Sequence, residues 1–322
     1  MLIPALLFIL GLILLIFCGD WFVDGSVGIA KKFHVPELLI GATIVSIGTT
    51  LPEVMVSASA AAQGFSATAY GNAVGSVICN TALISALTVA IAPSAVDRKT
   101  FLQPVIFFFA AAALYVSVAY FAGAFSRTVG LILLAVFVFY IALSCRKAIR
   151  HPAPAAEDPA QDDEKDAPVW RSVLLLIVGA AGIALGARLL VDNGTLIAEA
   201  LGVPESVIAL TFVALGTSLP ELVTAITSLV KGHSSLSLGN IIGANLFNLV
   251  FVSGLAITIS PFALPQEKQL FGMNASLAVD VPLMMAVMLL LTVPPLISGK
   301  LRRWQGIVLL LLYAGFCVFQ FA

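Results

Sequence analysis

The chain has little charge, and its composition excludes most soluble proteins. Only 10% of its 322 residues are charged and 60% are hydrophobic, whereas soluble domains carry about a quarter charged residues. The mean hydropathy is +1.08. The formal net charge of −1 shows no overall excess of basic residues, so a nucleic-acid partner is not expected. These values predict an integral membrane protein that has the lipid bilayer as its surroundings.

Cysteine and histidine are scarce, and neither has the spacing of a metal site. The four cysteines lie in or beside apolar runs, where they are expected to be small packing residues: Cys18, Cys79, Cys145 and Cys317. The three histidines fall in predicted loops, apart from one another: His34, His151 and His233. No nucleophile–base pair is visible in the apolar runs. We therefore expect no enzyme activity and no cofactor.

The apolar runs are long enough to cross a bilayer as helices. A spanning helix needs about 20 apolar residues, and strand alternation is absent, which favours helices over a barrel. The first run has no basic region or cleavage site before it and is interpreted as a retained span. The ten predicted spans are 1–19, 37–62, 70–92, 102–122, 128–146, 172–191, 205–230, 236–260, 273–297 and 304–322.

Basic residues are distributed very unequally between the two sides of these ten spans. One side receives Lys31, Lys32, Arg98, Lys99, Arg146, Lys147, Arg150, Lys165, Arg171, Lys231, Lys300, Arg302 and Arg303. The other side receives only Arg127 and Lys268. By the positive-inside rule the first side is cytoplasmic, and both termini then lie outside. The expected location is the inner membrane of a bacterium, with periplasmic termini.

One polar segment divides the chain into two halves. Residues 149–170 contain four prolines and six acidic residues, a composition typical of a flexible linker. The acids lack the spacing and the glycine of an EF-hand loop. We predict a first five-helix repeat over 1–148, an acidic cytoplasmic linker over 149–170, and a second repeat over 171–322.

The two halves are copies of each other at an offset of 168 residues. Residues 36–80 and 204–248 align without a gap and are identical at 16 of 45 positions. Because each half has an odd number of spans, the second copy must enter the membrane from the opposite face. The predicted fold is therefore an all-α membrane protein of ten helices, built as two inverted five-helix repeats, a common construction for secondary transporters.

A hexapeptide with a proline and a carboxylate occurs in the second span of each half. "GTTLPE" occupies residues 48–53 and "GTSLPE" occupies residues 216–221. Pro52 and Pro220 cannot donate a backbone hydrogen bond, so each helix is expected to kink or break there. The spacing of four between Thr49 and Glu53 predicts that hydroxyl and carboxylate share one helix face, and the second motif repeats this arrangement.

The third span of each half offers a second row of polar groups. Asn72, Ser76 and Asn80 recur at intervals of four, and Asn240, Ala244 and Asn248 occupy the corresponding places. Glycines beside them allow close helix packing. Carboxylate, hydroxyl, amide and carbonyl oxygens are hard ligands, which suit Ca²⁺ or Na⁺. Two facing carboxylates would neutralise one divalent cation, and without it one of them would bind a proton.

Each of these features also has an ordinary structural explanation. A lone proline kink, or a lone asparagine in a membrane helix, is more often structural than functional. A mid-span glutamate without a cationic partner is more often functional, and its duplication strengthens that interpretation. Asp280 has no acidic counterpart in the first half and is left out of the site. Charges near predicted span ends are expected to reach the interface: Asp20, Asp24, Arg188 and Asp192.

The paired motifs resemble the two alpha-repeats of the calcium/cation antiporter superfamily, which includes the sodium/calcium exchangers and their prokaryotic relatives. The resemblance covers the whole chain and implies alternating-access exchange of cytosolic Ca²⁺ for Na⁺, with the first and sixth spans sliding across the other eight. It further implies that Glu53 and Glu221 bind Ca²⁺ together with Thr49 and Thr217. The sodium sites would use the same glutamates with Thr50, Ser76, Ser218, Asn80 at the centre, and carbonyls near Ser46 and Ala214.

Two positions depart from the exchanger pattern and leave the counter-ion open. Asn248 stands where the second repeat often has aspartate, and Ala244 replaces an expected serine. Calcium binding by two glutamates survives both changes, but the coupled ion is Na⁺ or H⁺. A passive cation channel could use the same ligands, although inverted duplication favours two access states. The sequence does not fix the oligomeric state, and a monomer is expected to be sufficient for transport.

Overall fold

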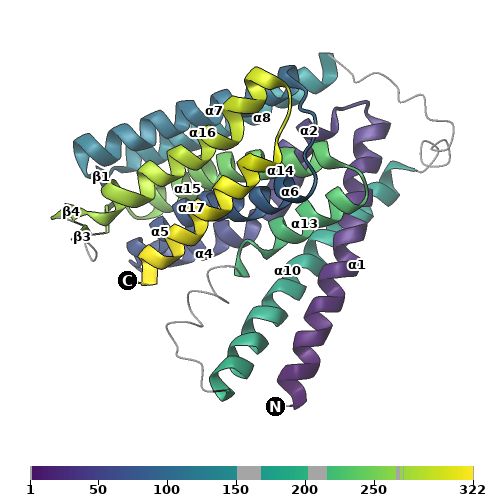
Figure 1. The fold of residues 1–322 in the computed structure, drawn as a ribbon, viewed down its shortest axis with the longest axis horizontal. Coiled ribbons are helices and arrows are strands. Elements are labelled where there is room, and N and C mark those ends of the chain that lie inside the picture. The colour runs from purple at the N-terminus through teal and green to yellow at the C-terminus, as the bar shows by residue number, and fades with distance from the viewer. Residues whose placement is uncertain (1, 151–167, 202–215, 266–268, 271, 322) are drawn as a thin grey trace.

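The computed structural model describes residues 2–150, 168–201, 216–265, 269–270 and 272–321, and these residues are almost entirely helical (Figure 1). The first half contains α1 (Leu2–Lys32), α2 (Glu37–Ile40), η1 (Gly41–Val45), α3 (Ser46–Thr49), α4 (Leu51–Ala62), α5 (Ser66–Cys79), η2 (Asn80–Ser85), α6 (Ala86–Ile91), α7 (Arg98–Ser117), η3 (Val118–Ala122) and α8 (Arg127–Arg150). The second half contains α10 (Val169–Ala200), α13 (Leu219–Val230), α14 (Ser234–Phe247), η6 (Asn248–Val252), α15 (Ser253–Ile259), η7 (Ser276–Asp280), α16 (Val281–Ser298) and α17 (Arg303–Phe321). The η segments are π-helical turns. The short strands are β1 (Ala124–Phe125), β2 (Phe262–Ala263), β3 (Gln269–Leu270) and β4 (Met273–Asn274).

The helices agree with the predicted membrane spans. Eight described helices are long and apolar enough to cross a bilayer, and nine when the bent pair Glu37–Thr49 and Leu51–Ala62 counts as one span. The predicted all-helical membrane protein is therefore confirmed. Helix α13 covers the last part of the predicted span 205–230, whose earlier residues lie outside the described part. Most of the predicted linker 149–170 also lies outside it.

Helix α1 is longer than the apolar run that predicted it. The run ends at residue 19, but the helix continues through Asp20 and Asp24 to Lys32. It stops shortly before Pro36, as expected for a residue that disfavours helix on its N-terminal side. His34, in the connection, has a positive φ of 52°. The two aspartates thus lie within a helix rather than at its end.

The duplication is visible in the backbone. Helices α4 and α13 have 12 residues each, α5 and α14 have 14 each, and within each pair the first residues are 168 apart. Gly64 and Gly232 make the turns between them with φ of 80° and 84°, a conformation that glycine adopts without strain. After α5 and α14, a π-helical turn begins at Asn80 and at Asn248.

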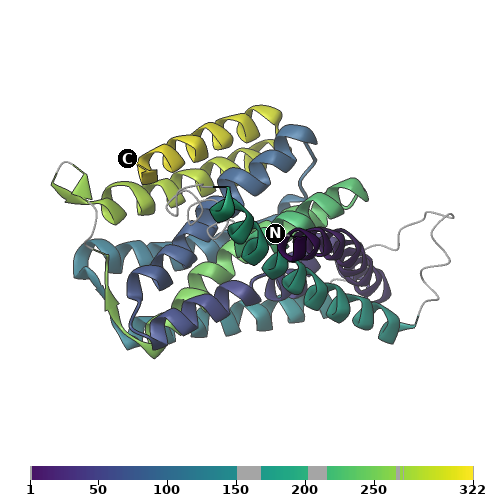
Figure 2. The ribbon, with the colours of Figure 1, turned by 90° about the horizontal axis from the view of Figure 1, so that it is seen from below.

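Helices α1 and α10 lie side by side along much of their length and form one packed unit (Figures 1 and 2). Their backbones approach closely at glycines: a Cβ on Gly179 would lie 2.6 Å from the backbone nitrogen of Phe22. Their buried side chains form a hydrophobic cluster with a few neighbours, separate from the larger core. That core is rich in aromatic residues from α7, α8 and α14, such as Phe108, Tyr140 and Phe247.

Loops from the two halves meet at both ends of α7. At its start, the backbone of Ala95 pairs with that of Lys300, and Asp97 caps the helix by accepting from the Lys99 backbone N–H at 3.1 Å. A hydrogen bond from the Thr100 hydroxyl lowers the pKa of Asp97. Beyond the other end of α7, β1 pairs antiparallel with β2. These contacts fix which loops share one side of the molecule.

Candidate ion-binding site

A helix begins at the Leu-Pro-Glu sequence of each hexapeptide, and in the first half this start interrupts a longer helical segment. The segment Glu37–Thr49 and helix α4 meet at an angle of 46°. Thr50 and Ser218 occupy the N-cap positions of α4 and α13 with nearly equal backbone angles, φ −82° and ψ −2° against φ −90° and ψ 5°. Serine and threonine usually cap a helix from this position, but neither hydroxyl does so here. Both hydroxyls are buried and have no hydrogen-bond partner among the residues that the structure describes, so their oxygens remain available to a ligand.

The two glutamates lie in the first turns of α4 and α13 and face a common interior. Glu53 and Glu221 are both 0% exposed, and they are close enough to interact electrostatically. Within the described part of the chain, none of their four carboxylate oxygens has a hydrogen-bond partner. Helix N-termini favour negative charge, which eases the burial of each carboxylate. That effect does not replace the partners that two buried carboxylates need.

The threonines of the first motif face the glutamate of the second. The Glu221 carboxylate lies within interaction range of the Thr49 and Thr50 hydroxyls, although its oxygens do not reach hydrogen-bond geometry. The helix is interrupted at Thr50, between Thr49 and Glu53, so the expectation that these two residues share one helix face stays a prediction. Residues of the first motif thus lie beside the glutamate of the second, so the two motifs form one site and not two separate ones.

Two asparagines complete the group of unpartnered polar side chains. Asn80 and Asn248 are fully buried, and neither their amide oxygens nor their amide nitrogens have a hydrogen-bond partner in the described ranges. Each begins a π-helical turn, a distortion that is frequent at functional sites. Buried polar groups without partners are rare in proteins. Their concentration here indicates an environment built for a polar ligand.

A reciprocal pair of hydrogen bonds joins the two halves. The Thr49 hydroxyl donates to Oδ1 of Asn240 at 3.2 Å, and the Thr217 hydroxyl donates to Oδ1 of Asn72 at 3.4 Å. Thr49 corresponds to Thr217, and Asn72 to Asn240, under the 168-residue offset. The Asn72 amide also donates to the backbone oxygen of Glu53 at 3.1 Å. Each asparagine thus holds the motif of the opposite half.

The remaining predicted site residues have more ordinary surroundings. The Ser46 backbone oxygen accepts from the Thr50 N–H at 3.0 Å, and the Ser46 hydroxyl donates to the Asn240 backbone oxygen at 2.9 Å. Ser76 is buried on α5. Ala214 lies outside the residues that the structure describes.

Sequence reasoning missed several side chains near the glutamates. Thr224 and Ser228 follow Glu221 along one face of α13, are fully buried, and have unpartnered hydroxyls. Helical spacing could have found them, but they correspond to Val56 and Ala60, so a search for duplicated polar positions passes over them. Cys79, interpreted as a packing residue, is buried and lies within electrostatic range of both glutamates.

The donor set consists of oxygen atoms. Among the described residues there is no group of three or more histidine, cysteine and acidic side chains, so a soft transition-metal site has no support there. A cavity of about 10 Å³ lies against Thr49, between Pro52 and Pro220. Carboxylate, hydroxyl and amide oxygens are the ligands that Ca²⁺ and Na⁺ prefer.

Comparison with known proteins agrees with this arrangement. The sodium/calcium exchanger protein family matches residues 3–146 and 171–322. The chain belongs to this family. Its members are membrane transporters that exchange cations, not catalytic enzymes. The match skips the segment that the composition marks as a linker.

Several relatives in this exchanger family extend over the whole chain. An uncharacterized membrane protein of Methanocaldococcus jannaschii is 37% identical over 306 residues, covering 95% of this chain and 94% of its own. The sodium/calcium exchanger MaX1 of Methanosarcina acetivorans is 29% identical, with 98% of each chain covered. A structure of the sodium-calcium exchanger NCX_Mj soaked with Na⁺ is 34% identical and superposes with a TM-score of 0.78 over 97% of both chains. The assignments of the fold and of the family therefore rest on comparisons over nearly the full length of the chain.

Proposed function

We propose that this protein is a secondary active antiporter that exchanges Ca²⁺ for Na⁺ by alternating access. The observation that carries the proposal is the pair Glu53 and Glu221, which are fully buried, interact electrostatically and have no hydrogen-bond partner among the described residues. One Ca²⁺ balances both charges, and so do two monovalent cations. Occupancy by Ca²⁺ and by Na⁺ is then mutually exclusive, which is the requirement for exchange. Both ions are transported substrates, and the mechanism needs no cofactor.

The ligands we assign extend from the glutamates to the neighbouring oxygens. Ca²⁺ binds the two carboxylates with Thr49 and Thr217. Na⁺ uses the same carboxylates with oxygens of Thr50, Ser218, Ser76, Asn80, Asn248, Ser46 and Ala214. The unpartnered oxygens of the glutamates, Thr50, Ser218 and the two asparagines support this assignment.

Asn72 and Asn240 act as positioning residues in this mechanism. A hydroxyl that binds a cation must turn its hydrogen away from the ion and its lone pairs toward it. The bonds from Thr49 to Asn240 and from Thr217 to Asn72 hold the hydrogens in that direction. Each of these hydrogen bonds joins a residue of one half to a residue of the other, so together they couple the two motifs into one site.

Asn240→Ala is expected to weaken Ca²⁺ binding about fivefold, the value of one hydrogen bond of about 1 kcal/mol. The half-saturating Ca²⁺ concentration for uptake into proteoliposomes measures this effect. In a Thr49→Val background the same substitution should have almost no further effect, because the bond is already absent. Asn193→Ala is the matched control, since the Asn193 amide donates to the Leu189 backbone oxygen of its own helix at 2.7 Å. Equal, additive losses in both backgrounds would contradict the positioning role.

We further propose ten spans in two inverted five-helix repeats, 1–148 and 171–322, joined by a cytoplasmic linker over 149–170. The equal helix bounds at the 168-residue offset support two equivalent units. The pairing of Ala95 with Lys300, and of β1 with β2, agrees with loops assigned to the same side by their basic residues. The proposed location is the bacterial inner membrane with both termini periplasmic, and one monomer is sufficient for transport.

Exchange of Ca²⁺ for H⁺ on the same fold is the second candidate. Asn248 and Ala244 remove a carboxylate and a hydroxyl from the sodium ligands that the family pattern suggests, and two interacting carboxylates favour protonation of one of them. A passive channel is a third candidate, but nothing in the site favours it.

Imposed ion gradients on proteoliposomes separate these candidates. An outward Na⁺ gradient at constant pH is expected to drive Ca²⁺ uptake against its own gradient, while a K⁺ gradient of the same size has no effect. Uptake that follows a pH gradient alone would favour H⁺ as the counter-ion. Ca²⁺ flux that proceeds down its gradient with no counter-ion would instead support a channel.

A further inference from the structure

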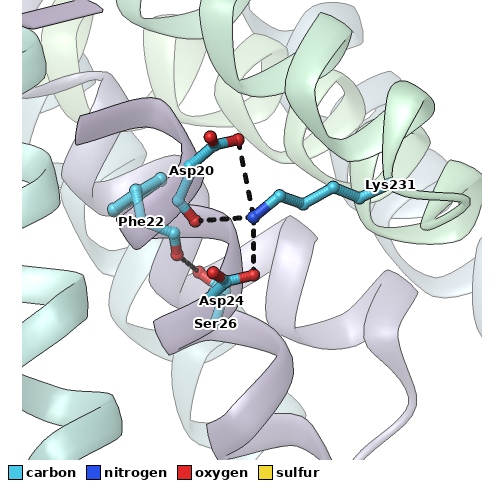
Figure 3. A network of polar contacts seen from close by, with 5 residues as sticks. All are labelled: Asp20, Phe22, Asp24, Ser26 and Lys231. Atoms are coloured by element: carbon cyan, nitrogen blue, oxygen red, sulfur yellow. Dashed lines mark hydrogen bonds and ion pairs between the residues drawn. The ribbon is translucent and has the colours of Figure 1, made fainter. Parts of the chain in front are cut away.

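Lys231 connects helix α13 to helix α1 through two aspartates (Figure 3). Its Nζ lies 2.7 Å from Oδ1 of Asp24, 3.4 Å from Oδ1 of Asp20 and 3.3 Å from the Asp20 backbone oxygen. The Lys231 side chain is 27% exposed, less than either aspartate. The ammonium group therefore sits between two carboxylates on successive turns of α1.

This contact continues a packed face of α13 that lies against α1. A Cβ on Gly19 would lie 2.7 Å from Cγ1 of Val223 and 3.2 Å from Oγ1 of Thr227. Val223, Thr227 and Lys231 are spaced four residues apart, so they form one stripe along the helix. Val223 and Thr227 pack closely against Gly19 of α1. Lys231 adds ion pairs at the end of this stripe.

The unit of α1 and α10 covers one side of the proposed ion site. Phe22 of α1 and Ala180 of α10 line the small cavity beside Thr49 and Pro52. A cation that enters between this unit and the remaining helices requires the unit to shift. The polar contacts that bridge this boundary then determine which access state is populated.

Lys231 is fixed on the other side of that boundary. It belongs to the three-residue connection from α13 to α14, and His233 of the same connection contacts Glu37 of α2 at 2.8 Å between Nδ1 and Oε1. The His233 backbone N–H also donates to the Ser228 oxygen at 2.7 Å. The Lys231 ammonium group therefore contacts α1 from a loop that is itself held in place by hydrogen bonds.

The equivalent position in the other half has no such contact. Under the 168-residue offset, Lys231 corresponds to Gln63, Asp20 to Arg188 and Asp24 to Asp192. Arg188 pairs with Asp192 of its own helix at 3.5 Å, and the Gln63 amide donates to Ser59 of its own helix at 2.9 Å. Of these two equivalent ends, only the one with Lys231 has an ion pair across the boundary among the described residues.

We propose that Lys231, Asp20 and Asp24 form an ionic latch that holds the α1–α10 unit closed at the cytoplasmic end and biases the protein toward the outward-accessible state. The latch rests on the proposed alternating-access function. A contact that exists in one access state shifts the equilibrium toward that state. Because the latch has no equivalent in the other half, the two access states are unequally populated although the two halves are similar in structure. Opening to the cytoplasm requires separation of the ammonium group from both carboxylates.

Labelling of a cysteine beneath the latch tests the proposal without any transport measurement. Thr227→Cys is introduced into a variant whose four native cysteines are replaced by alanine, and a membrane-impermeant maleimide is supplied from the cytoplasmic side of proteoliposomes. Lys231→Gln, which copies Gln63, is expected to raise the labelling rate about fivefold, the size expected for loss of a partly exposed ion-pair network. Raised salt should increase labelling only when Lys231 is present.

Two further variants separate the latch from a general loosening of the fold. Lys231→Glu combined with Asp24→Lys restores an attractive pair and is expected to return labelling toward the starting rate. Arg188→Gln removes the ion pair within α10 and should leave labelling unchanged. Unchanged labelling in Lys231→Gln, or failure of the charge exchange to restore it in a protein that remains monodisperse, would overturn the latch. If the unmodified protein showed no exchange of Ca²⁺ for Na⁺, the exchange proposal would be overturned, and increased labelling in Lys231→Gln would then show only that the ion pairs hold α13 against α1.

Discussion

Glu53→Gln and Glu221→Gln are each expected to abolish Ca²⁺ uptake. Either substitution leaves one carboxylate to balance a divalent cation in a buried site, where uncompensated charge is costly. Removal of one partner of a buried charge pair typically costs about 3–5 kcal/mol, which corresponds to a loss of binding of more than about 100-fold. Initial rates of Ca²⁺ uptake by the purified variants in proteoliposomes measure the effect.

The same substitutions should not unfold the protein. Glutamine has nearly the shape of glutamate, and it removes the repulsion between two adjacent buried carboxylates. In the absence of cations, each variant is therefore expected to melt at the same temperature as the unmodified protein or higher. The stabilisation that Ca²⁺ gives to the unmodified protein should disappear, because a ligand stabilises only the state that it binds.

Glu199→Gln is the matched control for both measurements. Glu199 lies exposed on α10, so the same chemical change there should leave uptake and Ca²⁺-dependent stabilisation intact. Substantial uptake by Glu53→Gln or Glu221→Gln would contradict the assignment of two calcium carboxylates. A loss of uptake together with a lower melting temperature would point to damage of the fold instead.

The sequence was sufficient for features that depend on local chemistry and on repetition. Proline at residues 52 and 220 predicts the helix breaks, since a missing N–H acts within one turn of the chain. The 168-residue offset predicts which helices correspond, and the equal bounds of α4 and α13 agree with it. Long apolar runs predict the spans because a bilayer imposes a minimum length.

Features that depend on contacts between distant residues were not predictable in the same way. Asp20 and Asp24 ended an apolar window, so the sequence did not predict that helix α1 continues past them to Lys32. Their partner Lys231 is more than 200 residues away in the chain. Helical spacing likewise could not predict the hydrogen bond between Thr49 and Asn240, because it relates Thr49 only to residues of its own motif.

Gly243→Val is expected to separate helix α14 from the first motif. A Cβ at this position would lie 2.2 Å from the Ser46 hydroxyl oxygen and 2.6 Å from the Ala42 Cα, distances that no packed side chain tolerates. The helix must therefore move away from η1 and α3, and Asn240 moves with it. Overpacking of a close contact typically costs about 1–3 kcal/mol, and here the loss of the Thr49 and Ser46 hydrogen bonds to Asn240 adds to it.

This variant should lose both stability and Ca²⁺ uptake, unlike the glutamine variants, which lose uptake alone. Thermal unfolding in detergent and uptake into proteoliposomes measure the two effects on the same preparation. Gly315→Val on α17 is the control, because a Cβ there meets no described atom within 4 Å. If Gly243→Val retained normal uptake, the close approach of α14 to the first motif would not be what brings Asn240 to Thr49. The geometry of the shared site would then have to depend on other helix contacts.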